Sequence, residues 1–192
     1  MKPSGSQLAL WAVLAAPAVA TVARQATGAI SYGEAIHESG EWAVRLLIAV
    51  LAVTPLRAAF PRAGWMRWVA RRRRDLGVAT FGYALLHLAV YLHRKAEAPG
   101  LVLREAADPG MAVGWIAFML FAVLAATSND ASVRLLKRAW KALHRWVYPA
   151  AALTVGHWVL TAFDPLEGWI YGGVLAALAA ARLLPARRPA TG

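Results

Sequence analysis

The feature that most constrains this chain is a series of apolar runs separated by polar or charged stretches. There are six runs, at about residues 8–23, 41–56, 76–92, 111–126, 143–162 and 168–184. A helix rises about 1.5 Å per residue, so each run is close to the length that crosses a hydrocarbon core of about 30 Å. The pattern predicts an all-α integral membrane protein. We expect a six-transmembrane-helix bundle in one domain over residues 1–192.

Composition favours the same class. The chain is 59% hydrophobic and 16% charged, whereas soluble domains are nearer half apolar and a quarter charged. A net charge of +11 would suggest nucleic acid in a soluble protein. Here the basic residues cluster between the apolar runs, so we expect a lipid bilayer as partner and no nucleic acid. The absence of cysteine excludes thiolate metal sites made by this chain.

Basic residues are distributed unequally between the loops. Residues 57–74 carry seven arginines and residues 134–145 carry five Lys or Arg, whereas the acidic residues gather in the alternate loops. The positive-inside rule places the arginine-rich side and both termini in the cytoplasm. The first run has a second interpretation, because Ala18-Val19-Ala20 resembles a signal-peptide cleavage site. Both interpretations leave residues 24–40 outside.

Two histidines lie well inside the apolar runs. An imidazole in hydrocarbon is costly without a partner, so it is functional by default. His87 follows Arg74 by thirteen residues, and His157 follows His144 by thirteen residues. His87 and His157 should therefore face each other on two helices, about 20 Å from the arginine-rich edge. With few carboxylates nearby they make a poor zinc or calcium site, but a good axial pair for haem.

His144 is expected near the cytoplasmic edge. There the arginines from Arg71 to Arg74, together with Arg145, could neutralise a haem propionate, a flavin phosphate or a lipid headgroup. Arg74 stands where a second histidine would be needed opposite His144. We therefore expect one bis-histidine haem and leave a second haem open.

Two features of the apolar runs have alternative interpretations, the phase of two histidines and the partner of an arginine. Thirteen residues leave His144 and His157 about 140° out of phase on an ideal helix. Either they face different clefts, or Pro149 alters the winding between them. Arg45 either pairs with Glu41, one turn earlier, or binds a cofactor propionate or phosphate.

Three segments together resemble a known family. They are GEWAVRLLIAVLAVTPLR (40–57), DLGVATFGYALLHLAVYL (75–92) and LAATSNDASVRLLKRAWKALHRWVYPAAALTVGHW (124–158). They resemble the MsrQ (YedZ) family, the haem-binding membrane subunits of the protein-methionine-sulfoxide reductase system, within the wider ferric reductase-like group. The specific feature is the joint spacing of TPLR, YALLH and LHR with a later histidine.

The resemblance implies a b-type haem linked to His87, His144 and His157, in a multi-pass protein of the bacterial inner membrane. It also implies FMN as a cofactor. Electrons would come from the quinone pool or a cytoplasmic flavin reductase. They would pass to MsrP, a periplasmic molybdopterin enzyme that reduces methionine sulfoxide in oxidised proteins. The catalytic site for methionine sulfoxide would then lie on MsrP and not on this chain.

Two other functions are compatible with the sequence. A cytochrome b561-like oxidoreductase for quinol or ascorbate would keep the haem and change the partner. A histidine-dependent transporter of metal ions or protons would use the intramembrane imidazoles as a relay. Against the transporter, the runs contain few carboxylates and no paired broken helices. Reduction by dithionite, followed optically, separates these classes.

Overall fold

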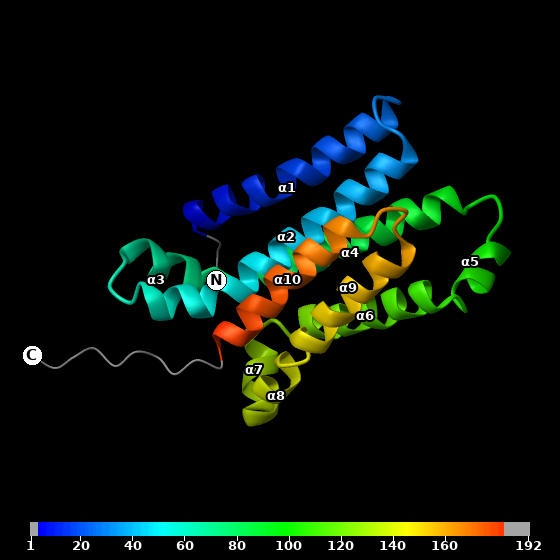
Figure 1. Cartoon of the computed structure of the whole chain (residues 1–192). Helices are drawn as coiled ribbons and strands as arrows, with labels where there is room; N and C mark the ends of the chain where they lie inside the picture. The colour runs from blue at the N-terminus through cyan, green and yellow to red at the C-terminus, as the bar shows by residue number, and fades with distance from the viewer. Residues whose placement is uncertain (1–3, 183–192) are drawn as a thin grey trace, which may run out of the picture.

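A computed structural model describes residues 4–182. All regular secondary structure in this part of the chain is α-helical (Figure 1). The helices are α1 (Gly5–Ala26), α2 (Tyr32–Ala59), α3 (Gly64–Arg71), α4 (Arg73–Arg94), α5 (Gly100–Glu105), α6 (Pro109–Ala126), α7 (Asp130–Leu136), α8 (Arg138–His144), α9 (Val147–Thr161) and α10 (Leu166–Ala181). The predicted all-α class is confirmed for the described residues.

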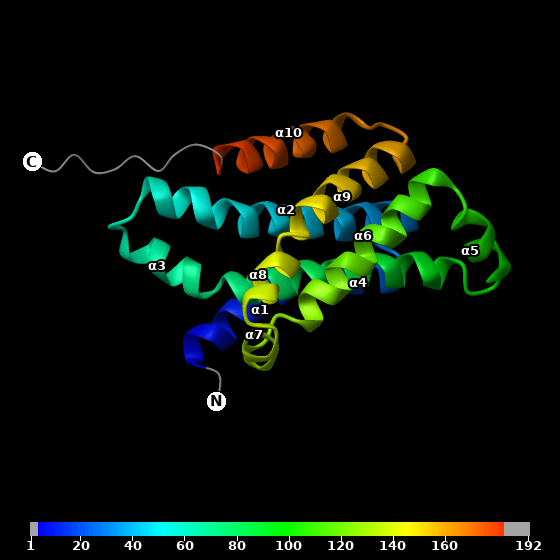
Figure 2. The same ribbon diagram turned by 90° about the horizontal axis from the view of Figure 1, so that it is seen from below.

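The six longer helices run back and forth between two ends of the molecule (Figures 1 and 2). We call the end that holds α3, α7 and α8 the basic end, because it carries residues 57–74 and 134–145. The start of α1 and the end of α10 also lie there. We call the other end, with α5 and the α1–α2 and α9–α10 turns, the acidic end. The charge asymmetry of the sequence is therefore an asymmetry between the two ends of the bundle.

Four helices are long and apolar enough to cross a membrane: α1, α2, α4 and α6. Helices α9 and α10 have 15 and 16 residues, which span only about 23 and 24 Å. The predicted run at 143–162 is not one helix, because α8 ends at His144 and α9 begins at Val147. The run at 168–184 ends in residues 183 and 184, which lie outside the described residues. Six crossings and cytoplasmic termini therefore stay predictions.

Helix α2 begins well before the apolar run that predicted it. Ser31 accepts a hydrogen bond from the Glu34 amide at 3.2 Å, and the Glu34 carboxylate accepts one from the Ser31 amide at 2.8 Å. This reciprocal capping box starts the helix at Tyr32. As a result Ile36 and Gly40, which the sequence placed in an outer loop, belong to a rigid helix beside α4.

The main core lies where α2, α6, α9 and α10 meet. Its buried side chains are Val44, Leu47, Leu51, Phe121, Leu124, Ala150, Ala151 and Leu175. Helix α1 packs instead against α2 and α4, and polar contacts hold it there. Asp75 of α4 accepts hydrogen bonds from Gln7 at 2.9 Å and Trp11 at 3.1 Å, and the Tyr83 hydroxyl donates to the Leu14 carbonyl at 2.8 Å.

A proline in α2 explains how the end of α10 is attached. Pro55 has no N–H, so the Leu51 carbonyl loses the donor that a helix normally supplies four residues later. Arg182 replaces it, donating from Nη2 to the Leu51 oxygen at 2.6 Å, while its Nη1 donates to the Tyr148 hydroxyl. The guanidinium thereby satisfies a helix carbonyl and ties α10 to α2 and α9.

Arg182→Met should lower the stability of the bundle by about 1–3 kcal/mol, because the Leu51 carbonyl is left without a donor. In a Pro55→Ala background the same change should cost less, since the new amide at position 55 can donate to Leu51. Unfolding of the four proteins in detergent, analysed as a double-mutant cycle, measures this coupling. Equal costs in both backgrounds would contradict the assignment.

Candidate functional site

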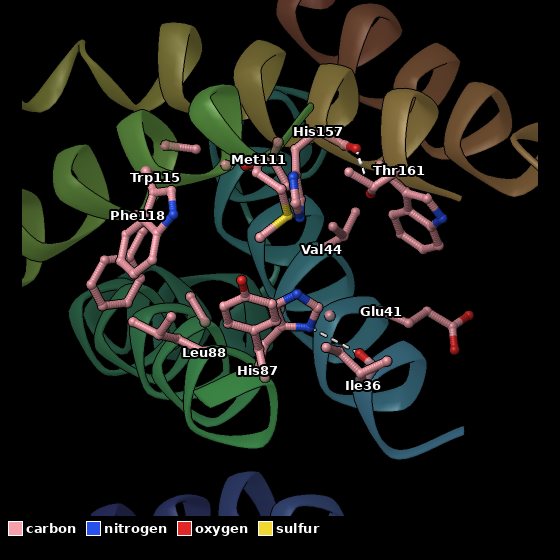
Figure 3. A pocket seen from close by; sticks show the side chains of 18 of the residues that line it. Ile36, Glu41, Val44, His87, Leu88, Met111, Trp115, Phe118, His157 and Thr161 are labelled. Atoms are coloured by element: carbon pink, nitrogen blue, oxygen red, sulfur yellow. Dashed lines mark hydrogen bonds between the residues drawn. The ribbon is translucent and has the colours of Figure 1, made fainter. Parts of the chain in front are cut away.

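Two neighbouring cavities lie within the bundle. The first, of about 440 Å³, is enclosed mainly by α2, α4, α6 and α9 (Figure 3). The second, of about 510 Å³, lies closer to the basic end and is reached by α8 and the end of α10. Leu47, Thr80 and Phe121 line both cavities. One layer of side chains therefore separates them.

His87 of α4 and His157 of α9 enter the first cavity from opposite sides (Figure 3). Their ring centroids are 6.1 Å apart, and the ring planes are nearly perpendicular at 88°. The structure thus brings together the two histidines that the sequence paired by depth. In the described part of the chain, no group of three or more His, Cys, Asp or Glu is placed to hold a metal ion.

Each of these histidines is held by a backbone carbonyl. His87 Nδ1 lies 2.9 Å from the Ile36 oxygen, and His157 Nδ1 lies 2.9 Å from the Gly110 oxygen. A carbonyl oxygen can only accept, so Nδ1 carries the hydrogen in both rings and Nε2 keeps its lone pair. Metal-bound histidines are oriented in this way by their second nitrogen. Both Nε2 atoms are therefore electronically suited to bind a metal.

Two glycines make room for these contacts. A Cβ on Gly40 would lie 3.0 Å from His87 Nδ1, and a Cβ on Gly114 would lie 2.6 Å from His157 Nδ1. Each glycine stands four residues after the residue whose carbonyl holds the ring. The α2–α4 pair and the α6–α9 pair therefore position their histidines by the same arrangement.

The second cavity is rich in cations. Arg73, Arg74, Lys141, Arg145 and Arg182 line it, together with His144, and no carboxylate does so among the described residues. The His144 ring stacks on Trp140 with centroids 3.9 Å apart, and its Nε2 lies 3.1 Å from the Thr127 hydroxyl.

The arginines proposed from the sequence as cofactor contacts lie in different surroundings. Arg74 and Arg145 line the second cavity, and Arg74 also pairs with Asp130 at 2.7 Å, which lowers the pKa of that carboxyl group. Arg71 is exposed and lines neither cavity. Arg45 lies outside both cavities as well. It pairs with Glu41 at 2.5 Å, so the structure favours the local ion pair over a cofactor contact.

His144 and His157 lie on different helices and line different cavities. Of the two interpretations of their phase, the first is therefore correct. Pro149 stands at the third residue of α9, after the break between α8 and α9.

Comparisons with known proteins agree with this architecture. Residues 39–155 match the family model described as ferric reductase like transmembrane component. A protein of Xanthomonas campestris pv. campestris (strain B100), named protein-methionine-sulfoxide reductase heme-binding subunit MsrQ, is 40% identical over 169 residues, covering 85% of this chain and 76% of that protein. The chain belongs to the MsrQ family of ferric reductase-like membrane proteins.

Other MsrQ relatives show similar coverage. One from Xanthomonas axonopodis pv. citri (strain 306) is 40% identical over 156 residues, covering 80% of this chain and 70% of the relative. One from Brucella anthropi is 38% identical over 151 residues, covering 77% and 66%. No solved structure matches the chain.

Several site residues carried no recognisable signal in this MsrQ sequence. Gly40 and Gly114 are ordinary small residues of an apolar helix until the opposing imidazole is known. Trp115, at the edge of the first cavity, is indistinguishable from an interfacial tryptophan. Arg182 stands near the end of the last apolar run, where an arginine is expected from topology alone.

Proposed function

We propose that this chain is the haem-binding membrane subunit of a methionine sulfoxide reductase system and carries electrons across the bacterial inner membrane to periplasmic MsrP. The observation that carries the proposal is the His87–His157 pair, with both Nε2 atoms free inside an apolar cavity. The names of the MsrQ relatives, which describe a haem-binding subunit, support it.

The spacing of the two rings fits a single iron. Metal–imidazole bonds are about 2.0–2.1 Å long, and a ring nitrogen lies about 1.2 Å from the ring centre, so two axial imidazoles have centres about 6.4 Å apart. The observed centroid separation is 6.1 Å. A b-type haem supplies one-electron transfer between ferric and ferrous iron when bound there.

The residues of the cavity favour electron transfer over oxygen chemistry. A haem held by both histidines would have no position left at its iron for a substrate, which suits electron transfer. The remaining wall is largely apolar, with Val44, Leu88 and Phe118 among its residues (Figure 3). Such a wall excludes water and fixes the ligands in one geometry.

We assign the second cavity to the electron donor. Its cations suit a phosphate or a polarised carbonyl, such as those of FMN or a quinone, and Arg74 and Arg145 are the proposed contacts. Because His144 Nε2 already contacts Thr127, and no second histidine lines this cavity in the described part, we propose that His144 contacts the donor. The two cavities share the wall of Leu47, Thr80 and Phe121, so an electron would travel only a short distance from the donor to the first cavity.

We propose that electrons leave at the acidic end. Six crossings with both termini in the cytoplasm would place this end in the periplasm, in agreement with the positive-inside rule. Its loops, at residues 24–40, 93–110 and 163–167, carry more carboxylates than basic side chains, which suits a partner with a basic patch. Methionine sulfoxide itself would be reduced on MsrP.

His87→Ala and His157→Ala should each abolish the low-spin haem spectrum of the purified protein, because each removes one axial ligand. His93→Ala is the matched control, since His93 lies on the same helix as His87 but is exposed and lines neither cavity. Absorbance of the reduced and oxidised proteins measures the effect. If both variants keep the wild-type Soret and α bands, the ligand assignment is wrong.

Gly114→Ala should reduce haem occupancy or change the low-spin spectrum, because the added methyl group would displace the His157 ring from the Gly110 carbonyl. Gly82→Ala is the control, since it adds the same atom to α4 where nothing lies within 4 Å. Haem-to-protein ratios and spectra of the two variants provide the comparison. Equal behaviour would show that the close glycine contact does not position the ligand.

In proteoliposomes, the full chain should support reduction of MsrP by an added quinol or by a cytoplasmic flavin reductase. The His87→Ala variant should support less than about a tenth of that rate, because electrons have no other route through the first cavity. MsrP activity with methionine sulfoxide gives the readout. A chain that keeps its haem and yet neither reduces nor copurifies with MsrP would favour the b561-like alternative.

A further inference from the structure

One hydrogen-bond donor in the first cavity has no partner. Among the described residues, only Trp115 Nε1 and Arg182 Nε are fully buried side-chain polar atoms without a hydrogen bond. Figure 3 shows the Trp115 indole at the edge of the cavity, with its nitrogen turned toward the space between the two histidines. Buried donors nearly always have a hydrogen-bond partner. This N–H therefore marks a place where a bound group should accept a hydrogen bond.

The same cavity holds an ammonium group nearer the acidic end. Lys95 and Glu105 line it there and pair with each other, and the Tyr91 hydroxyl donates to Glu105 at 2.7 Å. The Lys95 side chain is only 22% exposed. Because Glu105 keeps the Tyr91 donor, Lys95 can share its hydrogens with a second carboxylate without leaving Glu105 unsatisfied.

The wall that separates the first cavity from the second offers no comparable hydrogen-bond donor. Leu47, Thr80 and Phe121 are 2%, 3% and 8% exposed, and the Thr80 hydroxyl already donates to the Leu76 carbonyl at 3.0 Å. A carboxylate facing this wall would be desolvated without hydrogen bonds, which is strongly unfavourable. The end of the cavity near Lys95 and the wall toward the second cavity therefore differ in their ability to hold an anion.

Given the haem of the proposed function, we propose that Trp115 Nε1 and Lys95 Nζ form the binding site for its propionate carboxylates. The donors fix which edge of the macrocycle faces the acidic end, whereas the two histidines fix only its plane. Trp115 and Lys95 are thus positioning residues, separate from the iron ligands. They also place the propionate edge at the end where electrons are delivered.

The test compares two porphyrins on the haem-free full chain in lipid nanodiscs. Iron protoporphyrin IX has both carboxylates, whereas its dimethyl ester lacks them and keeps the same ring and iron. Wild type should bind the native form more tightly than the ester. Trp115→Phe should weaken binding of the native form about tenfold and leave ester binding nearly unchanged, as expected for one hydrogen bond to a charged group.

Lys95→Gln is a second variant, at the end of α4, and should lower the same native-to-ester affinity ratio. Trp158→Phe is the matched control, because this indole also lines the cavity but stacks on Tyr171 at 5.3 Å, and its Nε1 is not among the fully buried donors without a partner. Its affinity ratio should equal that of wild type. Because the ester measures any general damage to the pocket, a partly destabilised variant remains interpretable.

Two results would overturn the proposal. The first is an unchanged ratio in both Trp115→Phe and Lys95→Gln. The second is a ratio that falls in Arg73→Gln instead, which would turn the propionates toward the second cavity. Failure of the proposed function looks different, because wild type would then give no bis-histidine spectrum with either porphyrin.

Discussion

The site depends on one constraint, which is that an imidazole must reach a carbonyl inside an intact helix. A helix carbonyl already accepts from the amide four residues later, and the Cβ of that later residue tilts back over the same oxygen. Glycine is the residue that leaves the oxygen open. Gly40 uncovers the Ile36 carbonyl for His87, and Gly114 uncovers the Gly110 carbonyl for His157.

This constraint also sets the helix pairing. A ring that contacts the backbone of its neighbour requires the two helices to approach closely, so α4 packs along α2 and α9 packs along α6. His87 and His157 then extend into the space between the α2–α4 pair and the α6–α9 pair (Figure 3). The cavity is thus a consequence of two glycine-mediated contacts, and the distance between the imidazoles is set by backbone and not by flexible side chains.

Much of this could be predicted from the sequence, and the limits have physical causes. Hydrophobic length and arginine clusters indicated the helices, and equal spacing from the basic edge paired His87 with His157. The break between α8 and α9 was missed because residues 143–162 are mostly apolar, so Pro149 was considered only as a change of winding within one helix, whereas it stands in the first turn of α9. The environment of Arg45 stayed undecided because Glu41 is always within reach in a helix, so only the cavity geometry separates the two interpretations. Trp115 could not be identified, because a missing partner is a property of the folded cavity.

The two ends of the bundle balance their charges differently. At the acidic end, Arg24, Arg45 and Lys95 each pair with a glutamate of the same chain. At the basic end, Arg73, Arg145 and Arg182 surround a cavity that no carboxylate lines in the described part. Like charges repel unless an anion joins them. Under the proposed function, the basic end therefore keeps positive charge for a small anionic electron donor.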